Sequence, residues 1–183
     1  KFLYAGCGYG GSCFPKDVRA LIATAEKLGY SMEVVKAVER VNNRQKQILF
    51  EKLHRHFCGE LQGKTIAVWG LSFKPDTDDL REAPSLVLID GLLNAGCRVQ
   101  VFDPVAMDNA RAIYGDRLIY THNIYEAATD ADALVVVTEW KEFRLPAWAT
   151  LQRVMRGCVI ADGRNIYNGE KLRQMGFTYY KIG

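Results

Sequence analysis

The first third of the chain carries hydrophobic residues at helical spacing. Counting from Pro15, apolar side chains recur every three to four positions as far as Leu28, and Gly29 follows. This period predicts a helix over about 15–28, because glycine readily takes the left-handed dihedrals that end helices.

A second apolar stripe predicts one long helix. It begins after Ser31, which can cap it, and continues toward Phe57 before Cys58 and Gly59 end the pattern. The stripe consists of Val34, Val38, Val41, Ile48, Leu49 and Leu53. A helix of roughly 26 residues is about 39 Å long, which is enough to connect two domains.

Beyond residue 63 the pattern changes to short, continuous apolar runs, which are typical of strands buried on both faces. The predicted strands cover residues 65–70, 99–103, 133–137, 158–162 and 177–181. The predicted helices lie near residues 83–95, 107–113, 123–129, 146–155 and 169–175. This alternation predicts an α/β fold with a doubly wound parallel sheet over residues 61–183, and the helical residues 1–60 form a separate unit.

Composition narrows the function classes. The 183 residues are 49% hydrophobic and 25% charged, as in an ordinary globular chain. Twenty-four basic residues against 21 acidic ones give a net charge of +3, and they are dispersed, so no nucleic acid partner is expected. No apolar stretch is long enough to span a membrane, so no membrane partner is expected either.

Cysteine and histidine usage argues against a disulfide framework or a metal site. The five cysteines are odd in number and include no C-x-x-C pair. His54 and His56 are two apart on a predicted helix and point to different sides, and His122 stands alone. A reducing cytoplasm is the simplest setting.

The richest candidate chemistry is a cysteine within the glycine-rich residues 6–17. Gly8, Gly10 and Gly11 let the backbone approach a ligand closely. Cys13 follows them and lies just before the predicted helix start at Pro15. This arrangement is typical of a loop that presents a reactive thiol.

Charged neighbours strengthen this interpretation. The positive end of the helix dipole and the ammonium of Lys16, one turn on, favour the thiolate form of Cys13. Asp17 is a candidate for positioning water or a proton. The structural alternative is that Cys13 is a small buried packing residue. Cys7 is a second thiol in the loop, either able to oxidise with Cys13 or a neutral small residue.

Residues 8–17, Gly-Tyr-Gly-Gly-Ser-Cys-Phe-Pro-Lys-Asp, closely resemble the active-site segment of UDP-glucose 6-dehydrogenases, in the UDP-glucose/GDP-mannose dehydrogenase family. Phe14 favours the UDP-glucose branch, because the GDP-mannose enzymes often carry leucine there. The resemblance covers the chain as a C-terminal portion. It implies a Rossmann-like UDP-binding domain preceded by part of the central dimerisation domain.

The carboxyl ends of the predicted strands are the expected ligand edge of such a sheet. The loop after the first strand lacks the full G-x-G-x-x-G fingerprint, and only Asp103 lies near the ribose position, so a standard NAD site is not expected there. A nucleotide sugar fits better, with Lys74 and Arg164 facing a diphosphate and Phe73 beside a base or sugar ring.

The resemblance also implies individual roles. Substrate binding falls to Tyr4, Gly6, Gly8, Tyr9, Gly10, Phe73, Lys74 and Arg164. Contacts with the cofactor NAD fall to Cys13, Lys16 and Arg81. For the acidic residues 76–79, a solvated lead-in with capping oxygens is the structural alternative.

The implied reaction oxidises UDP-glucose to UDP-glucuronate in two hydride transfers. Cys13 is the catalytic nucleophile, which forms a thiohemiacetal and then a thioester. Asp17 is the second catalytic residue and orients the hydrolytic water. A homodimer through the long helix is also implied.

The chain does not begin with Met, and the resembled enzymes open with an NAD-binding domain that has no counterpart here. We therefore expect a piece that is inactive alone and has the missing N-terminal domain as a partner. Two alternatives stay open. One is oxidation of GDP-mannose or another UDP-sugar by the same chemistry, and the other is a non-catalytic nucleotide-binding or dimerisation module.

Overall fold

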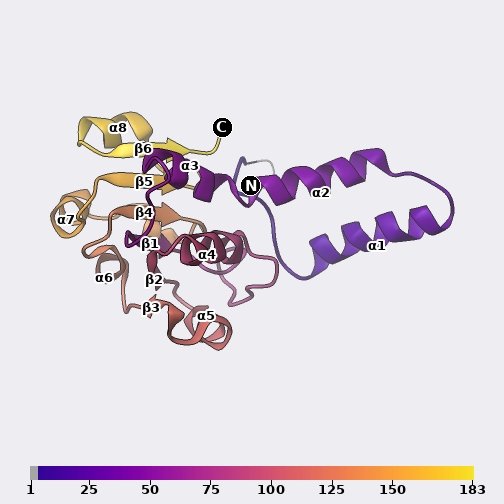
Figure 1. The fold of residues 1–183 in the computed structure, drawn as a ribbon, viewed down its shortest axis with the longest axis horizontal. Helices are drawn as coiled ribbons and strands as arrows, with labels where there is room; N and C mark the ends of the chain where they lie inside the picture. The colour runs from indigo at the N-terminus through magenta and orange to yellow at the C-terminus, as the bar shows by residue number, and fades with distance from the viewer. Residues whose placement is uncertain (1–3) are drawn as a thin grey trace.

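A six-stranded, wholly parallel sheet forms the body of the protein. The computed structural model describes residues 4–183, and in it the strands lie in the order β3-β2-β1-β4-β5-β6 (Figure 1). The strands are β1 (Thr65–Trp69), β2 (Arg98–Phe102), β3 (Ile119–Tyr120), β4 (Ala133–Val136), β5 (Val159–Asp162) and β6 (Thr178–Lys181). The order reverses direction between β1 and β4, so the expected doubly wound parallel sheet is confirmed.

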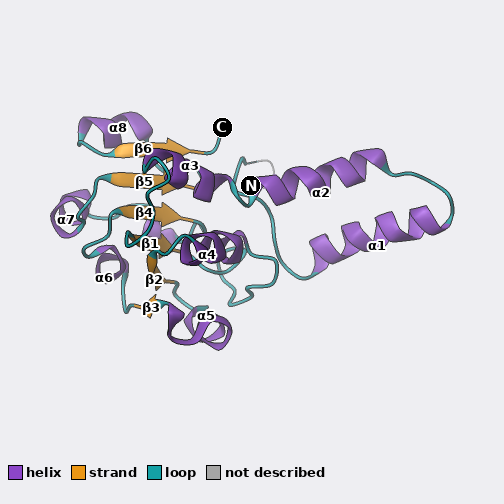
Figure 2. Ribbon diagram, in the orientation of Figure 1, coloured by secondary structure: helices purple, strands orange, loops and turns teal. Residues whose placement is uncertain are grey.

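Helices cover both faces of the sheet, because the strands alternate their side chains between two cores. One face carries α3 (Ile48–His56), α4 (Pro84–Asn94) and α5 (Met107–Tyr114). The other carries α6 (Ile124–Ala128), α7 (Trp148–Val154) and α8 (Gly169–Gln174). Short 3-10 turns, η1 (Gly115–Arg117) and η2 (Lys141–Phe143), follow α5 and β4 (Figure 2).

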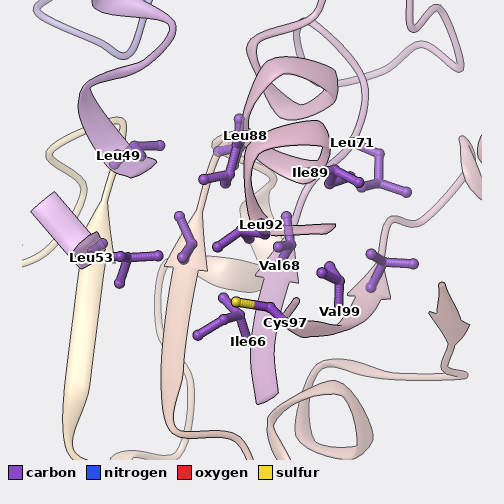
Figure 3. Packing of buried hydrophobic residues seen from close by; sticks show 14 of the residues in the cluster. Leu49, Leu53, Ile66, Val68, Leu71, Leu88, Ile89, Leu92, Cys97 and Val99 are labelled. Carbon is purple, nitrogen blue, oxygen red and sulfur yellow. The ribbon is translucent and has the colours of Figure 1, made fainter. Parts of the chain in front are cut away.

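The first core shows how the continuous apolar runs are used. In β1, Ile66 and Val68 face the α3–α4 side while Ala67 and Trp69 face the opposite side. Figure 3 shows Leu49 and Leu53 of α3 beside the leucines of α4 above the strands. The helix α3 therefore contributes to the core of the sheet unit.

Strand β3 was not predicted. It pairs only through Gln100 with Ile119 and through Val101 with Tyr120, at the edge of the sheet. Ile119 is exposed and Tyr120 is half-buried. Its apolar run, Leu118-Ile119-Tyr120, is only three residues long, which is too short to mark a strand in the sequence pattern.

Two helices project from the body as an antiparallel hairpin. Figure 1 shows α1 (Cys13–Lys27) and α2 (Glu33–Gln45) extending away from the sheet on the side to which the strand arrowheads point. The helix α1 begins two residues earlier than predicted. Pro15 is its third residue, where the missing N–H costs nothing because first-turn amides have no intrahelical partner.

The prediction of one long helix is wrong. Helices α2 and α3, of 13 and 9 residues, are separated at Lys46 and Gln47. Both residues keep right-handed helical dihedrals, and the Gln47 N–H bonds to the Arg44 carbonyl three residues back, at 3.0 Å. Because the interruption preserves the rotation of the chain, the apolar stripe runs through it unchanged. Ser31 does not cap α2: its hydroxyl bonds to the Glu33 carboxylate, and Met32 takes the capping position.

Candidate functional site

The glycine-rich loop is fixed to the carboxyl edge of the sheet at two points. The Cys7 N–H donates to the Gly163 carbonyl, just after β5, at 2.9 Å. The Gly11 N–H donates to the Arg81 carbonyl, in the long loop after β1, at 2.8 Å. The loop therefore joins the ends of two different strands, in agreement with the ligand edge that the sequence predicts.

The helix α2 holds the same loop from the other side. Asn42, which is 7% exposed, accepts from the Tyr9 N–H at Oδ1 (2.8 Å) and donates from Nδ2 to the Tyr9 carbonyl (3.2 Å). Gln45 Nε2 donates to the Gly6 carbonyl at 2.8 Å. These amides satisfy buried backbone groups of an irregular segment. Sequence reasoning missed both, although a polar residue on the buried side of an amphipathic helix was the available signal.

Two glycines are required by close packing. A side chain at Gly10 would place its Cβ 2.4 Å from the Glu82 carbonyl oxygen. At Gly11, where φ is +93°, the Cβ would lie 2.9 Å from the Phe73 ring. Any other residue would push the loop away from these neighbours. The remaining loop residues predicted to bind substrate also lie here, with Gly8 against Lys46.

The Cys13 thiol stands at the edge of this assembly, in the first turn of α1. Its side chain is exposed, and its sulfur lies 3.6 Å from the Ser12 hydroxyl. The expectation that Cys13 lies just before the helix is corrected, since it is the first helical residue. Lys16 and Asp17 follow at helical spacings of three and four, so all three side chains share one helix face.

Lys16 and Asp17 are open to solvent. Their side chains are 76% and 68% exposed, and Lys16 Nζ lies 3.9 Å from Asp17 Oδ1. A pair this exposed contributes little to stability. Both groups are thus free to approach a ligand that reaches Cys13.

The loop after β1 brings Phe73 and Lys74 to the same edge. The Phe73 ring packs against Gly11, two residues before Cys13. Lys74 is exposed, and its ammonium lies 5.3 Å from the centre of the Phe73 ring. An aromatic ring with a cation above it can contact a sugar or base and a phosphate together.

Arg81 lies farther along the same loop. It forms two parallel hydrogen bonds with Asp79, from Nε to Oδ1 (2.9 Å) and from Nη2 to Oδ2 (2.8 Å). This pairing lowers the pKa of Asp79, and the Arg81 side chain remains 70% exposed. The bond to Asp79 also raises the pKa of Arg81. The Arg81 carbonyl accepts the Gly11 N–H, so this loop passes beside the residues just before Cys13.

Part of the acidic segment 76–79 has a structural role. Thr77 Oγ1 accepts from the Asp79 N–H at 3.2 Å within the loop, and α4 has no side-chain cap, so these residues form a turn and do not cap a helix as the structural alternative supposed. Asp79 itself is 17% exposed and orients Arg81 rather than lying in solvent. Its role as a positioning group was not predicted.

Arg164 completes the edge from β5. Its Nε donates to the Val137 carbonyl at 2.6 Å and lies 3.3 Å from Glu139 Oε2. A side chain at Gly6 would place its Cβ 2.9 Å from Arg164 Nη1, so the guanidinium borders the glycine loop. The structure thus brings Arg164 beside the loop, and its predicted contact with a diphosphate stays a prediction.

A buried carboxylate shapes the Arg164 turn. Asp162 is fully buried and accepts from the N–H groups of Arg164, Ile166 and Tyr167 and from the Tyr179 hydroxyl, at 2.8–3.1 Å. Burial raises the pKa of Tyr167, and the nearby charge of Asp162 raises it further. This carboxylate was missed because it ends an apolar run and carries no motif of its own.

Cys7 is not a second reactive thiol. It is completely buried, its sulfur lies 3.8 Å from the Val137 carbonyl, and burial raises its pKa. These observations favour the role of a neutral small residue over oxidation with Cys13.

The acidic residue at the end of β2, Asp103, is bonded within the protein. The Asp103 carboxylate is 1% exposed and is already fully engaged. It accepts from the N–H groups of Leu71, Ser72, Val105 and Ala106 and from the Trp140 indole. A ribose hydroxyl would have to displace these donors. The cations Lys16 and Arg81, in contrast, are exposed beside Cys13 and fit the phosphates of a dinucleotide.

Tyr4 is the predicted site residue least engaged with this edge, since its side chain is 80% exposed. Tyr9 packs edge-to-face on Phe14 with ring centres 4.8 Å apart, and burial raises its pKa. Among residues 4–183, no three His, Cys, Asp or Glu side chains are grouped to hold a metal ion. In the same part of the chain, no helix combines the length and apolarity needed to cross a membrane.

Known proteins are similar to this chain over its whole length. Residues 67–169 match the model of the UDP-glucose/GDP-mannose dehydrogenase family, UDP binding domain, and residues 1–44 match that of the family's central domain. A UDP-glucose 6-dehydrogenase of Pseudomonas aeruginosa is 53% identical over 100% of this chain and 41% of its own length. One from Rhizobium meliloti is 43% identical over 100% of this chain and 42% of its own length.

A solved structure agrees with these relatives. The UDP-glucose dehydrogenase of the hyperthermophilic archaeon Pyrobaculum islandicum superposes with a TM-score of 0.83 at 36% identity, over 98% of this chain and 38% of that one. The chain therefore spans about two fifths of the length of the curated relatives it matches, which are 41% and 42% covered.

Proposed function

Because the chain belongs to the UDP-glucose/GDP-mannose dehydrogenase family, we propose that it is the C-terminal part of an NAD-dependent UDP-glucose 6-dehydrogenase. The observation that carries the proposal is the exposed Cys13 thiol at the first turn of α1, joined by its loop to the ligand edge of a doubly wound sheet. Alone, the piece is expected to be inactive.

The substrate site is proposed at the carboxyl edge of the sheet. Residues 61–183 would hold the UDP-sugar, and residues 1–60 would form part of the central domain. Phe73 offers a ring face, and Lys74 and Arg164 offer cations for the diphosphate from the ends of β1 and β5. The remaining contacts would come from Tyr4, Gly6, Gly8, Tyr9 and Gly10, whose segment lies between this edge and the thiol.

The chemistry proposed for Cys13 has two oxidations. The C6 hydroxyl of UDP-glucose loses a proton and a hydride and becomes an aldehyde. The Cys13 thiolate forms a C–S bond to that carbon while the C=O π bond breaks and its oxygen takes up a proton, which gives a thiohemiacetal. The thiohemiacetal then loses a proton and a hydride to become a thioester. Water then cleaves the C–S bond, which releases UDP-glucuronate and returns the thiol. When bound, NAD⁺ accepts the hydride of each oxidation.

Asp17 and Lys16 are proposed to have different roles in this reaction, one toward water and the other toward the cofactor. Asp17 shares the helix face of Cys13 and is exposed, so its carboxylate can orient the water that attacks the thioester. Lys16 and Arg81 would border NAD next to Cys13. Since Asp103 is engaged by its own loops, the rest of the cofactor must be held by the family's N-terminal domain.

We also propose a homodimer through the hairpin and a cytoplasmic setting. The outer face of α2 leaves Val34, Val38 and Val41 exposed by 78%, 43% and 50%. Apolar side chains at helical spacing on one face are typical of a helix that packs against a partner. All five cysteines are free, as in a reducing compartment.

The deciding experiment uses the full-length parent protein. UDP-glucose and GDP-mannose are offered separately, and the NADH formed per sugar consumed is counted. We expect about two NADH per UDP-glucose, because each of the two oxidations releases one hydride. Two per GDP-mannose and none with UDP-glucose would retain the thiol chemistry and overturn the sugar. None with either would leave only a binding module.

A further inference from the structure

Glu82 occupies an unusual position between the two units of the chain. It lies two residues before α4, and its φ is +56°, in the left-handed region that non-glycine residues seldom adopt. Such strained residues persist only where the surrounding structure fixes them, and they concentrate at functional sites.

The Glu82 carboxylate connects three segments. Oε1 accepts from Arg19 Nη2 of α1 at 2.6 Å, and Oε2 accepts from Lys46 Nζ, at the break between α2 and α3, at 3.0 Å. The Arg19 Nε in turn lies 3.4 Å from Glu39 Oε1 on α2. Lys46, Glu82, Arg19 and Glu39 thus form a chain of alternating charges that ties the loop after β1 to both hairpin helices.

The two cations keep Glu82 charged. The hydrogen bond from Arg19, followed by that from Lys46, holds the pKa of the Glu82 carboxyl below its usual range. The Lys46 side chain is only 5% exposed, so its ammonium depends on this carboxylate for charge compensation.

The backbone at the same place supports the glycine loop. The Glu82 carbonyl contacts Gly10, and the preceding Arg81 carbonyl accepts the Gly11 N–H. One residue therefore touches the loop just before Cys13 through its backbone and the helix that carries Cys13 through its side chain. Arg19 lies six residues after Cys13 on that helix.

We propose that Glu82 is a positioning residue for Cys13: its carboxylate fixes the direction of α1 relative to the glycine loop and so places the thiol against the substrate carbon. The inference rests on the proposed function only in assigning the reaction to that thiol. Misplacing a reacting group by about 1 Å can cost about a hundredfold in rate while substrate binding persists. The carboxylate should therefore affect kcat more than KM.

The test compares Glu82→Gln with Glu26→Gln in the full-length parent. Glu26 forms the matched control, since its carboxylate pairs with Lys36 across the same two helices at 2.8 Å without touching the loop. For Glu82→Gln we expect kcat with UDP-glucose to fall about tenfold or more, with KM within about threefold. Amide hydrogen exchange should rise in peptides covering residues 8–19 and the segment around Lys46, which contain the two partners of the carboxylate, and not in the rest of the chain. Glu26→Gln should change none of these by more than about twofold.

A second variant guards against misfolding. Arg19→Gln removes only the half-exposed Arg19–Glu82 ion pair and keeps the Lys46–Glu82 pair. It should lower kcat in the same direction as Glu82→Gln, but by less. Unchanged kcat in Glu82→Gln, or faster exchange throughout the chain, would overturn the positioning role. If the unmodified parent forms no NADH from UDP-glucose, the proposed function fails, and the exchange comparison of residues 8–19 still decides whether Glu82 fixes this segment.

Discussion

The hairpin and the sheet unit use hydrophobic side chains in opposite ways. In the sheet unit, Trp69, Leu88 and Leu134 are fully buried between the strands and their covering helices. In the hairpin, Leu21 is 50% exposed and Leu28 is 81% exposed, and Pro15 is the only buried residue of α1. The sheet unit therefore has a core of its own, whereas the apolar positions of the hairpin are suited to contacts with other protein surfaces.

Cys13, the proposed nucleophile, lies where these two regions meet, so its removal should produce the largest effect. We expect Cys13→Ser in the full-length parent to reduce formation of UDP-glucuronate by about 10³-fold or more, because a hydroxyl is a far weaker nucleophile than a thiolate. Cys158→Ser, at another exposed thiol, is the control and should retain full activity. Normal turnover by the Cys13 variant would refute the thioester mechanism.

Removing a hydrophobic side chain should affect the stability of the two regions differently, which is the next largest effect. Leu88→Ala should lower the free energy of unfolding by about 2–5 kcal/mol, because it opens a cavity in a filled core. Leu21→Ala, at a 50% exposed position of α1, should change it by less than about 0.5 kcal/mol. Urea unfolding followed by far-ultraviolet circular dichroism measures both. Equal losses would show that the hairpin has a core of its own.

The proposed dimer surface gives a third contrast. Val41 on α2 and Ile113 on α5 are both 50% exposed. Val41→Glu in the full-length parent should weaken self-association by about tenfold or more, because it places a charge in an apolar contact. Ile113→Glu should leave the oligomer unchanged. Sedimentation velocity distinguishes the results, and an intact oligomer in both variants would place the interface elsewhere.

Asn42 tests the connection between the regions. Replacement by Ala leaves the Tyr9 N–H and carbonyl without partners, which should cost about 1–3 kcal/mol of stability. The KM for UDP-glucose should rise as the loop loosens. Asn43→Ala, at the exposed neighbouring position, is the control. An unchanged KM in the Asn42 variant would mean that the loop conformation does not depend on α2.

The smallest expected effect is a difference in alkylation rate among the exposed cysteines. Burial raises the pKa of Cys97 to about 11, and it also raises that of Cys7, so neither should react with iodoacetamide in the native chain at pH 8. The exposed Cys13, Cys58 and Cys158 should react, and peptide mass spectrometry identifies each site. We expect Cys13 to react about threefold faster than the other two. An equal rate would favour the non-catalytic module.

Much of the sheet unit could be predicted because each part has a local signal. The apolar runs marked β1, β4 and β5, which are buried on both faces, and also β2, which is fully buried only at Val99 and Val101. The alternation with helices predicted the parallel arrangement. Strand β3 was not predicted because it has only two residues, at the edge of the sheet, in an apolar run of only three. The break at Lys46 and Gln47 left no trace in the periodicity, because the helical rotation continues through it.

The candidate site divides in the same way. The segment around Cys13 and the strand ends at Phe73 and Arg164 could be identified from residue types and order. The groups that hold them, Asn42 and Asp162, could not, because each works through backbone atoms: Asn42 bonds to the backbone of Tyr9, which is distant in sequence, and Asp162 bonds to the backbone of the turn that follows it. A hydrogen bond to a backbone group places no demand on the residue type at the other end.

The sequence by itself determined the fold class and singled out Cys13 as the candidate thiol, because these depend on local periodicity and on residue chemistry. Only the tertiary structure decided which side chains meet. It pairs the Glu82 carboxylate with Arg19 and Lys46, and it surrounds the Asp103 carboxylate with hydrogen-bond donors. It also leaves the Arg81 side chain exposed to solvent. Those pairings depend on how loops from separate strands converge in space, and no spacing along the chain encodes that convergence.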